Sequence, residues 1–97
     1  MQPIDYLTKF ENEFKNDDDR TRIISTTRQQ ILYSMVRIKK KVALVELKHL
    51  YSDERTFISS INNLAFIGVL KRVDDEFIEY VEYKNIEVDS NGTNGTL

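Results

Sequence analysis

A helical pattern of apolar positions spans residues 52–66, in the middle of the chain. Ser52 suits the N-cap of such a helix, and acids at Asp53 and Glu54 suit its first turn. Gly68 follows it and can end the helix by taking a positive φ. With about 100° between successive residues, one face is apolar and contains Phe57, Ile58, Ile61, Leu64 and Ala65.

The opposite face of this helix carries short hydrogen-bonding side chains, where a solvated helix normally carries Glu and Lys. Short polar side chains allow a helix to approach a nucleic-acid groove closely, and Asn can make two hydrogen bonds to an adenine edge. The alternative is a solvent-facing helix that happens to be rich in Ser and Asn. The candidate base-contacting residues on this face are Arg55, Thr56, Ser59, Asn62 and Asn63.

An amphipathic helix is predicted over residues 3–16, with Pro3 in its first turn. Its narrow apolar stripe has little to cover in so small a domain. We therefore expect a homodimer in which the stripe contacts a second copy across a two-fold axis. The alternative is packing on the core of its own domain. The predicted dimer interface consists of Ile4, Leu7, Phe10 and Phe14.

A second helix is predicted from Thr26 or Thr27 to about Lys40, with Tyr33 and Arg37 away from its apolar face. A short helix over residues 45–51 leads directly into residues 52–66, which is the order of a helix-turn-helix. The apolar face of the second helix contains Ile31, Leu32, Met35, Ile38 and Val42.

Acidic residues at 17–19 separate the first two helices, and we interpret them as a solvated connector. A calcium loop is the alternative. The run lacks the alternating ligand spacing, the glycine and the closing glutamate of such a loop, so no metal site is expected.

Two strands are predicted after Gly68, over residues 69–73 and 77–83, because both runs are rich in branched and aromatic residues. They form a hairpin whose tip is Asp74-Asp75-Glu76. The tail over residues 87–97 is polar and glycine-bearing, which predicts disorder. We therefore expect an α+β, mainly α domain over residues 1–86, with a helical N-terminal segment (1–16) and a core (26–83).

The net charge of −2 conceals an uneven distribution of charge. Residues 20–72 carry a net charge of +8, whereas residues 1–19 carry −4 and residues 73–97 carry −6. A basic centre between acidic flanks indicates that one face of the molecule can meet phosphates. The candidate phosphate-contacting residues are Arg28, Lys39, Lys40, Lys41, Lys71 and Arg72.

From residue 26 to residue 83 the sequence resembles a winged helix-turn-helix domain of the MarR-, ArsR- and PadR-like regulators and of small archaeal viral or plasmid proteins. The best local match is Ile61-Asn62-Asn63-Leu64-Ala65-Phe66-Ile67-Gly68-Val69-Leu70, which is similar to the end of the family's recognition helix. The resemblance implies a sequence-specific, dimeric transcriptional regulator whose recognition helix, about 52–66, enters the major groove of double-stranded DNA.

The wing departs from the family pattern, because wings that contact DNA usually carry Arg or Lys at the tip. The acids at 74–76 are repelled by phosphates. Either the wing stays off the DNA, or the domain is a protein-interaction or assembly module that does not bind DNA.

Other classes of function find little support in the sequence. There is one His, no Cys and no phosphate-binding glycine loop, so we expect neither an enzyme nor a cofactor. His49 is expected to face solvent or the core edge. Without a signal-peptide pattern or a long apolar run, we expect an intracellular, cytoplasmic protein that contacts no membrane.

Overall fold

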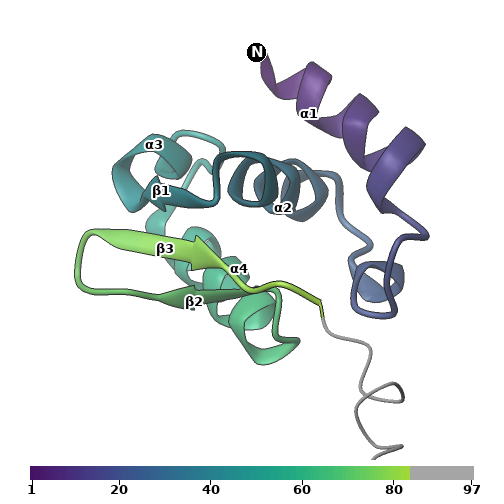
Figure 1. The fold of residues 1–97 in the computed structure, drawn as a ribbon. Coiled ribbons are helices and arrows are strands. Elements are labelled where there is room, and N and C mark those ends of the chain that lie inside the picture. The colour runs from purple at the N-terminus through teal and green to yellow at the C-terminus, as the bar shows by residue number, and fades with distance from the viewer. Residues whose placement is uncertain (84–97) are drawn as a thin grey trace, which may run out of the picture.

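The computed structural model describes residues 1–83, so the predicted tail lies outside the described residues (Figure 1). These residues form a mainly helical α+β domain with one small sheet, and the order of the elements is compatible with a winged-helix shape. The elements are α1 (Pro3–Lys9), the π-helical turn η1 (Phe10–Phe14), the 3-10 turn η2 (Thr21–Ile23), α2 (Thr27–Lys39), β1 (Lys41–Ala43), α3 (Leu44–Lys48), α4 (Glu54–Phe66), β2 (Leu70–Arg72) and β3 (Phe77–Tyr80).

The sheet is antiparallel and has three strands in the order β1-β3-β2, one more than the predicted hairpin (Figure 1). β2 and β3 form the hairpin, with Lys71 opposite Glu79, and β1 adds Val42 opposite Ile78. Val42 is therefore a strand residue, and its assignment to the helical stripe of α2 was wrong. α2 ends where Lys40 takes a φ of 72°, which turns the chain into β1.

Helix α4 begins one residue later than the sequence predicts. Asp53, and not Ser52, is the N-cap, and its carboxylate accepts a hydrogen bond from the backbone N–H of Thr56 at 2.8 Å. Gly68 takes a φ of 88°, as predicted for the residue that ends this helix. Phe66 lies just before that turn and is 89% exposed, so it does not anchor the helix to the core.

The core is organised around Tyr33, which the helical pattern had placed on the outside of α2. Its side chain is 1% exposed, because three aromatic rings that are distant in sequence meet it edge-on. The ring centroids of Phe10, Phe14 and Tyr80 lie 5.8, 6.1 and 6.0 Å from that of Tyr33. Such edge-to-face pairs each add to the stabilisation from area burial. Helix α2 therefore buries residues on several of its faces, from Ile31 to Val36, whereas an amphipathic helix buries only one face.

The N-terminal stripe packs mainly on its own chain, which corrects part of the predicted dimer interface. Phe10 and Phe14 are 1% and 7% exposed within the single chain, so they have no surface to offer a second copy. Leu7 is half-buried against the same core, and Ile4 is 62% exposed. The assignment of Phe10 and Phe14 to the interface was wrong because the sequence pattern does not show that α2 has an aromatic side chain, Tyr33, for η1 to cover.

Asp18 is buried, so the acidic run is not a solvated connector throughout. Its side chain is 3% exposed and pairs with Arg20, which is 13% exposed, at 3.1 Å. The Asp18 carboxylate also accepts hydrogen bonds from the backbone N–H groups of Arg20 and Thr21 at 2.7 and 3.2 Å. Asp19, by contrast, makes an exposed pair with Arg22, as a solvated residue does.

Arg20 connects this segment to the ends of α4 and β3. Its guanidinium donates to the backbone carbonyls of Gly68 and Val81 at 2.6 and 2.7 Å. Burial opposes the charge of Arg20, but the hydrogen bond and charge of Asp18 outweigh it and raise the pKa of Arg20. We call Asp18 and Arg20 the arginine latch, because they fasten residues 17–23 to the rest of the domain.

Candidate nucleic-acid interface

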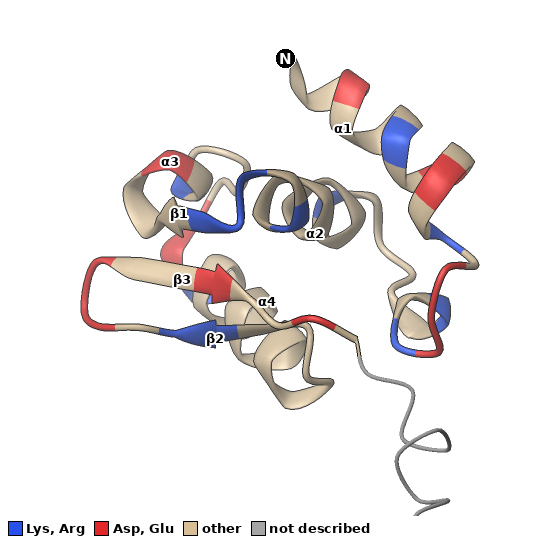
Figure 2. Ribbon diagram, in the orientation of Figure 1, with Lys and Arg blue, Asp and Glu red and all other residues tan. Residues whose placement is uncertain are grey.

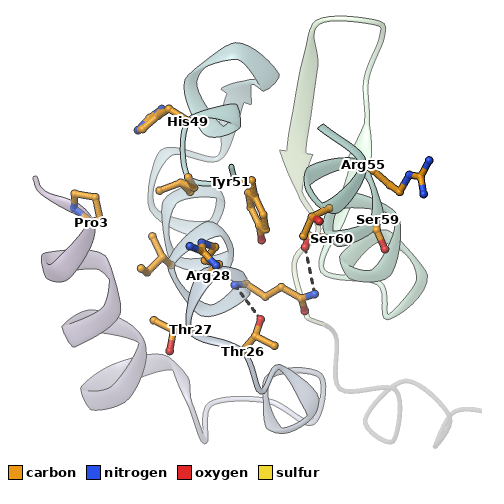
Figure 3. A pocket seen from close by; sticks show the side chains of 13 residues that line it. Pro3, Thr26, Thr27, Arg28, His49, Tyr51, Arg55, Ser59 and Ser60 are labelled. Carbon is orange, nitrogen blue, oxygen red and sulfur yellow. Dashed lines mark hydrogen bonds between the residues drawn. The ribbon is translucent and has the colours of Figure 1, made fainter. Parts of the chain in front are cut away.

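A groove of about 1000 Å³ lies between the start of α2, the α3–α4 turn and the first turns of α4 (Figure 3). Arg28 and His49 lie on its α2 and α3 side, and Arg55 and Ser59 lie on its α4 side. None of the described residues that line this groove is Asp or Glu, whereas a smaller cavity beside β1 and α4 is lined by Glu54 and Glu76, and another beside α1 and α3 by Glu46. The α2–α4 groove therefore offers cationic and hydroxyl groups to a ligand.

Tyr51 forms the floor of the α2–α4 groove. Burial raises the pKa of Tyr51. Tyr51 Oη is buried and makes no hydrogen bond with any described residue. A tyrosine in this state stays neutral at physiological pH, so the floor adds no negative charge to the groove.

The five predicted base-contacting residues are all exposed on α4, on the side that borders this groove or continues from it. Thr56 is less available than the prediction assumed, because its hydroxyl donates to the Asp53 carboxylate at 2.8 Å. Hydrogen bonds from the Thr56 backbone and hydroxyl lower the pKa of Asp53, so this carboxylate stays charged beside the outer face. The five exposed residues predicted to contact bases are Arg55, Thr56, Ser59, Asn62 and Asn63.

Gln29 belongs to this surface, although nothing in the sequence pattern selects it. Its side chain accepts a hydrogen bond from Asn63 Nδ2 at 3.2 Å. It also donates one to Ser60 Oγ at 3.5 Å, drawn as a dashed line in Figure 3. Only the packing of α2 against α4 brings the two amides together.

The predicted phosphate-contacting residues do not form one surface. Arg28 lines the groove at the start of α2, whereas Lys39–Lys41 lie where α2 runs into β1, about 20 Å along a helix of this length. Lys71 and Arg72 lie on β2 (Figure 2). Three of the lysines pair with glutamates, namely Lys39 with Glu46, Lys40 with Glu82 and Lys71 with Glu79.

The tip of the β2–β3 hairpin, which the sequence predicts to be a wing, is acidic and is held by hydrogen bonds from its own side chains. Asp74 Oδ1 accepts hydrogen bonds from the backbone N–H groups of Glu76 and Phe77 at 2.8 and 3.0 Å, which holds the turn between β2 and β3. Figure 2 shows the tip as a continuous acidic segment at the end of the hairpin. One of the three acids therefore has a structural role, because Asp74 Oδ1 accepts the hydrogen bonds that hold the turn.

Comparisons with protein-family models, with curated proteins and with solved structures found no match to this chain. Within residues 1–83, no His, Cys, Asp and Glu side chains form a group of three or more that could hold a metal ion. None of the described helices has the length and apolar character needed to cross a membrane.

Proposed function

We propose that this chain is a winged helix-turn-helix protein that binds double-stranded DNA in a sequence-specific manner and regulates transcription. In this proposal α4 enters the major groove, and Arg28 contacts the phosphates of the adjoining strand. A two-fold DNA site and a homodimer belong to the same proposal. The side chain of Ile4 is the exposed member of the N-terminal stripe and is available for the dimer contact.

The observation that carries this proposal is the coincidence of the carboxylate-free groove with the outer face of α4. The groove places Arg28 and His49 beside the face of α4 on which the short polar side chains of Thr56, Ser59 and Asn63 are exposed. The Arg28 guanidinium attracts a phosphate backbone, while bases in the major groove can pair with the polar side chains of α4. A merely solvated helix does not need this arrangement.

The first test replaces four outer-face side chains with alanine: Arg55, Thr56, Ser59 and Asn63. We expect sequence-specific binding to be lost, with each bidentate contact contributing about 1–3 kcal/mol. Thr56 should contribute least, since its hydroxyl already bonds to Asp53. Fluorescence anisotropy, with duplexes enriched from a random pool, measures the effect.

Arg55→Ala is also made alone, and Arg22→Ala is its matched control. Both residues are exposed arginines, but Arg22 lies on η2 and not on α4. Arg22→Ala should leave specificity unchanged. Intact specific binding by the fourfold variant would show that α4 is not the recognition helix.

A second prediction concerns the wing acids, changed to Asp74→Asn, Asp75→Asn and Glu76→Gln. We expect tighter binding to specific and random duplexes alike, because repulsion of phosphates is removed. The gain should be larger at low salt, since charges are screened over about 10 Å at 0.1 M salt. Asparagine in place of Asp74 keeps the side-chain oxygen that holds the turn. A selective loss of specific binding would instead mean that the acids accept hydrogen bonds from bases, for example from cytosine.

A protein-interaction module is the second candidate function, and the charge pairing favours it. Lys39, Lys40 and Lys71 already pair with glutamates, and the wing tip is acidic. Salt titration separates the two functions, because DNA binding weakens steeply as counterions are released. Failure to bind any duplex at low salt would favour the protein-interaction module.

A further inference from the structure

The side-chain amides of Gln29 on α2 and Asn63 on α4 are joined at the edge of the α2–α4 groove. Asn63 Nδ2 donates to Gln29 Oε1 at 3.2 Å, and Gln29 Nε2 donates to Ser60 Oγ at 3.5 Å. Ser60 is 5% exposed and therefore fixed by the core, whereas Asn63 is exposed. In this arrangement the Gln29 amide turns its oxygen towards Asn63 and its nitrogen towards Ser60.

We propose that Gln29 is a positioning residue that makes Asn63 select adenine over guanine. This inference rests on the proposed DNA-binding function. A side-chain amide has two N–H donors and one carbonyl acceptor. Because Gln29 takes one N–H of Asn63, one donor and the acceptor of Asn63 remain for a base.

This remaining pattern fits only one of the two purines. In the major groove adenine presents an acceptor at N7 and a donor at N6, which one N–H and one carbonyl of Asn63 satisfy together. Guanine presents two acceptors, N7 and O6, and would need both N–H groups. The bond to Gln29 removes the second N–H. It also orders Asn63 before binding, so less rotamer entropy is lost in the complex.

The experiment uses Gln29→Met, which keeps a long unbranched side chain and removes both amide groups. A random duplex library first gives the sequence that the unaltered protein prefers, and Asn63→Ala identifies the base position that Asn63 contacts. Two duplexes that differ only in adenine or guanine there are then compared. We expect the preference for adenine to fall from about tenfold to about twofold in Gln29→Met, because Asn63 recovers its second donor.

Gln30→Met is the control, since Gln30 is the same residue type on the same helix. Its Nε2 donates to the Ile24 carbonyl at 2.9 Å, so its loss should lower the melting temperature without changing base preference. An unchanged adenine preference in Gln29→Met would overturn the proposal. Equal relaxation in both variants would also overturn it, because it would show a general loosening of α2.

Failure of the proposed function gives a different result. In that case the unaltered protein enriches no sequence from the library, and the role of Gln29 in base selection falls with the DNA-binding function. NMR of the unbound protein then still reports on the bond itself. The Asn63 side-chain amide signals should move in Gln29→Met and stay in place in Gln30→Met if the bond is made.

Discussion

Asp18→Ala is expected to lower the free energy of unfolding by about 3–5 kcal/mol. The change leaves the Arg20 guanidinium buried without its carboxylate and removes the acceptor for the Thr21 backbone N–H. A loss of this size is a large part of the stability of a small domain, which is about 5–15 kcal/mol. Urea denaturation followed by circular dichroism measures it.

The neighbouring residue provides a control with the same chemistry. Asp19 pairs with Arg22, and their side chains are 74% and 62% exposed. Exposed pairs of this kind contribute about 0–1 kcal/mol, so Asp19→Ala should change stability little. Equal losses for Asp18→Ala and Asp19→Ala would show that the arginine latch does not stabilise the fold.

Phe10→Ala is expected to cost about 3–5 kcal/mol, because it leaves a cavity beside Tyr33 in the core. Ile4→Ala removes an exposed side chain from the same N-terminal segment. It should change the free energy of unfolding by no more than about 0.5 kcal/mol. Thermal unfolding of the two variants gives the comparison. Because Phe10 and Phe14 are part of the core, deletion of residues 1–16 should unfold the domain and not yield a folded monomer.

The same variants separate core packing from dimerisation. If Phe10 served mainly as a dimer contact, light scattering would show Phe10→Ala as a monomer of nearly unchanged stability. Ile4→Ala tests the exposed part of the proposed interface in the same way. A dimer that persists in both variants would place the contact on another surface.

Local signals in the sequence were enough to predict α4 and the hairpin. The apolar spacing of α4, the acids in its first turn and Gly68 at its end depend on neighbours along the chain, and the structure agrees with them to within one residue at the N-cap. The outer face of α4 was predicted by the same periodicity. Its predicted residues are all exposed.

The features that the sequence did not reveal all depend on distant partners. β1 has three residues and is a strand only because it pairs with β3. Tyr33 is buried by rings from residues 10, 14 and 80. Asp18 is buried because Arg20 reaches carbonyls on Gly68 and Val81. Gln29 likewise acquires its role from Asn63, which lies on another helix.

The arginine latch also has a consequence for synthesis of the protein. Arg20 is made early, but its carbonyl partners lie 48 and 61 residues further along the chain. On the ribosome the contact with Gly68 cannot form until residue 68 has left the exit tunnel, and the contact with Val81 cannot form until residue 81 has. Closing so long a loop costs entropy that local helices do not incur. Residues 17–23 are therefore fastened only after residues far along the chain have been made, and a nascent chain that ends before residue 68 holds Arg20 without either carbonyl.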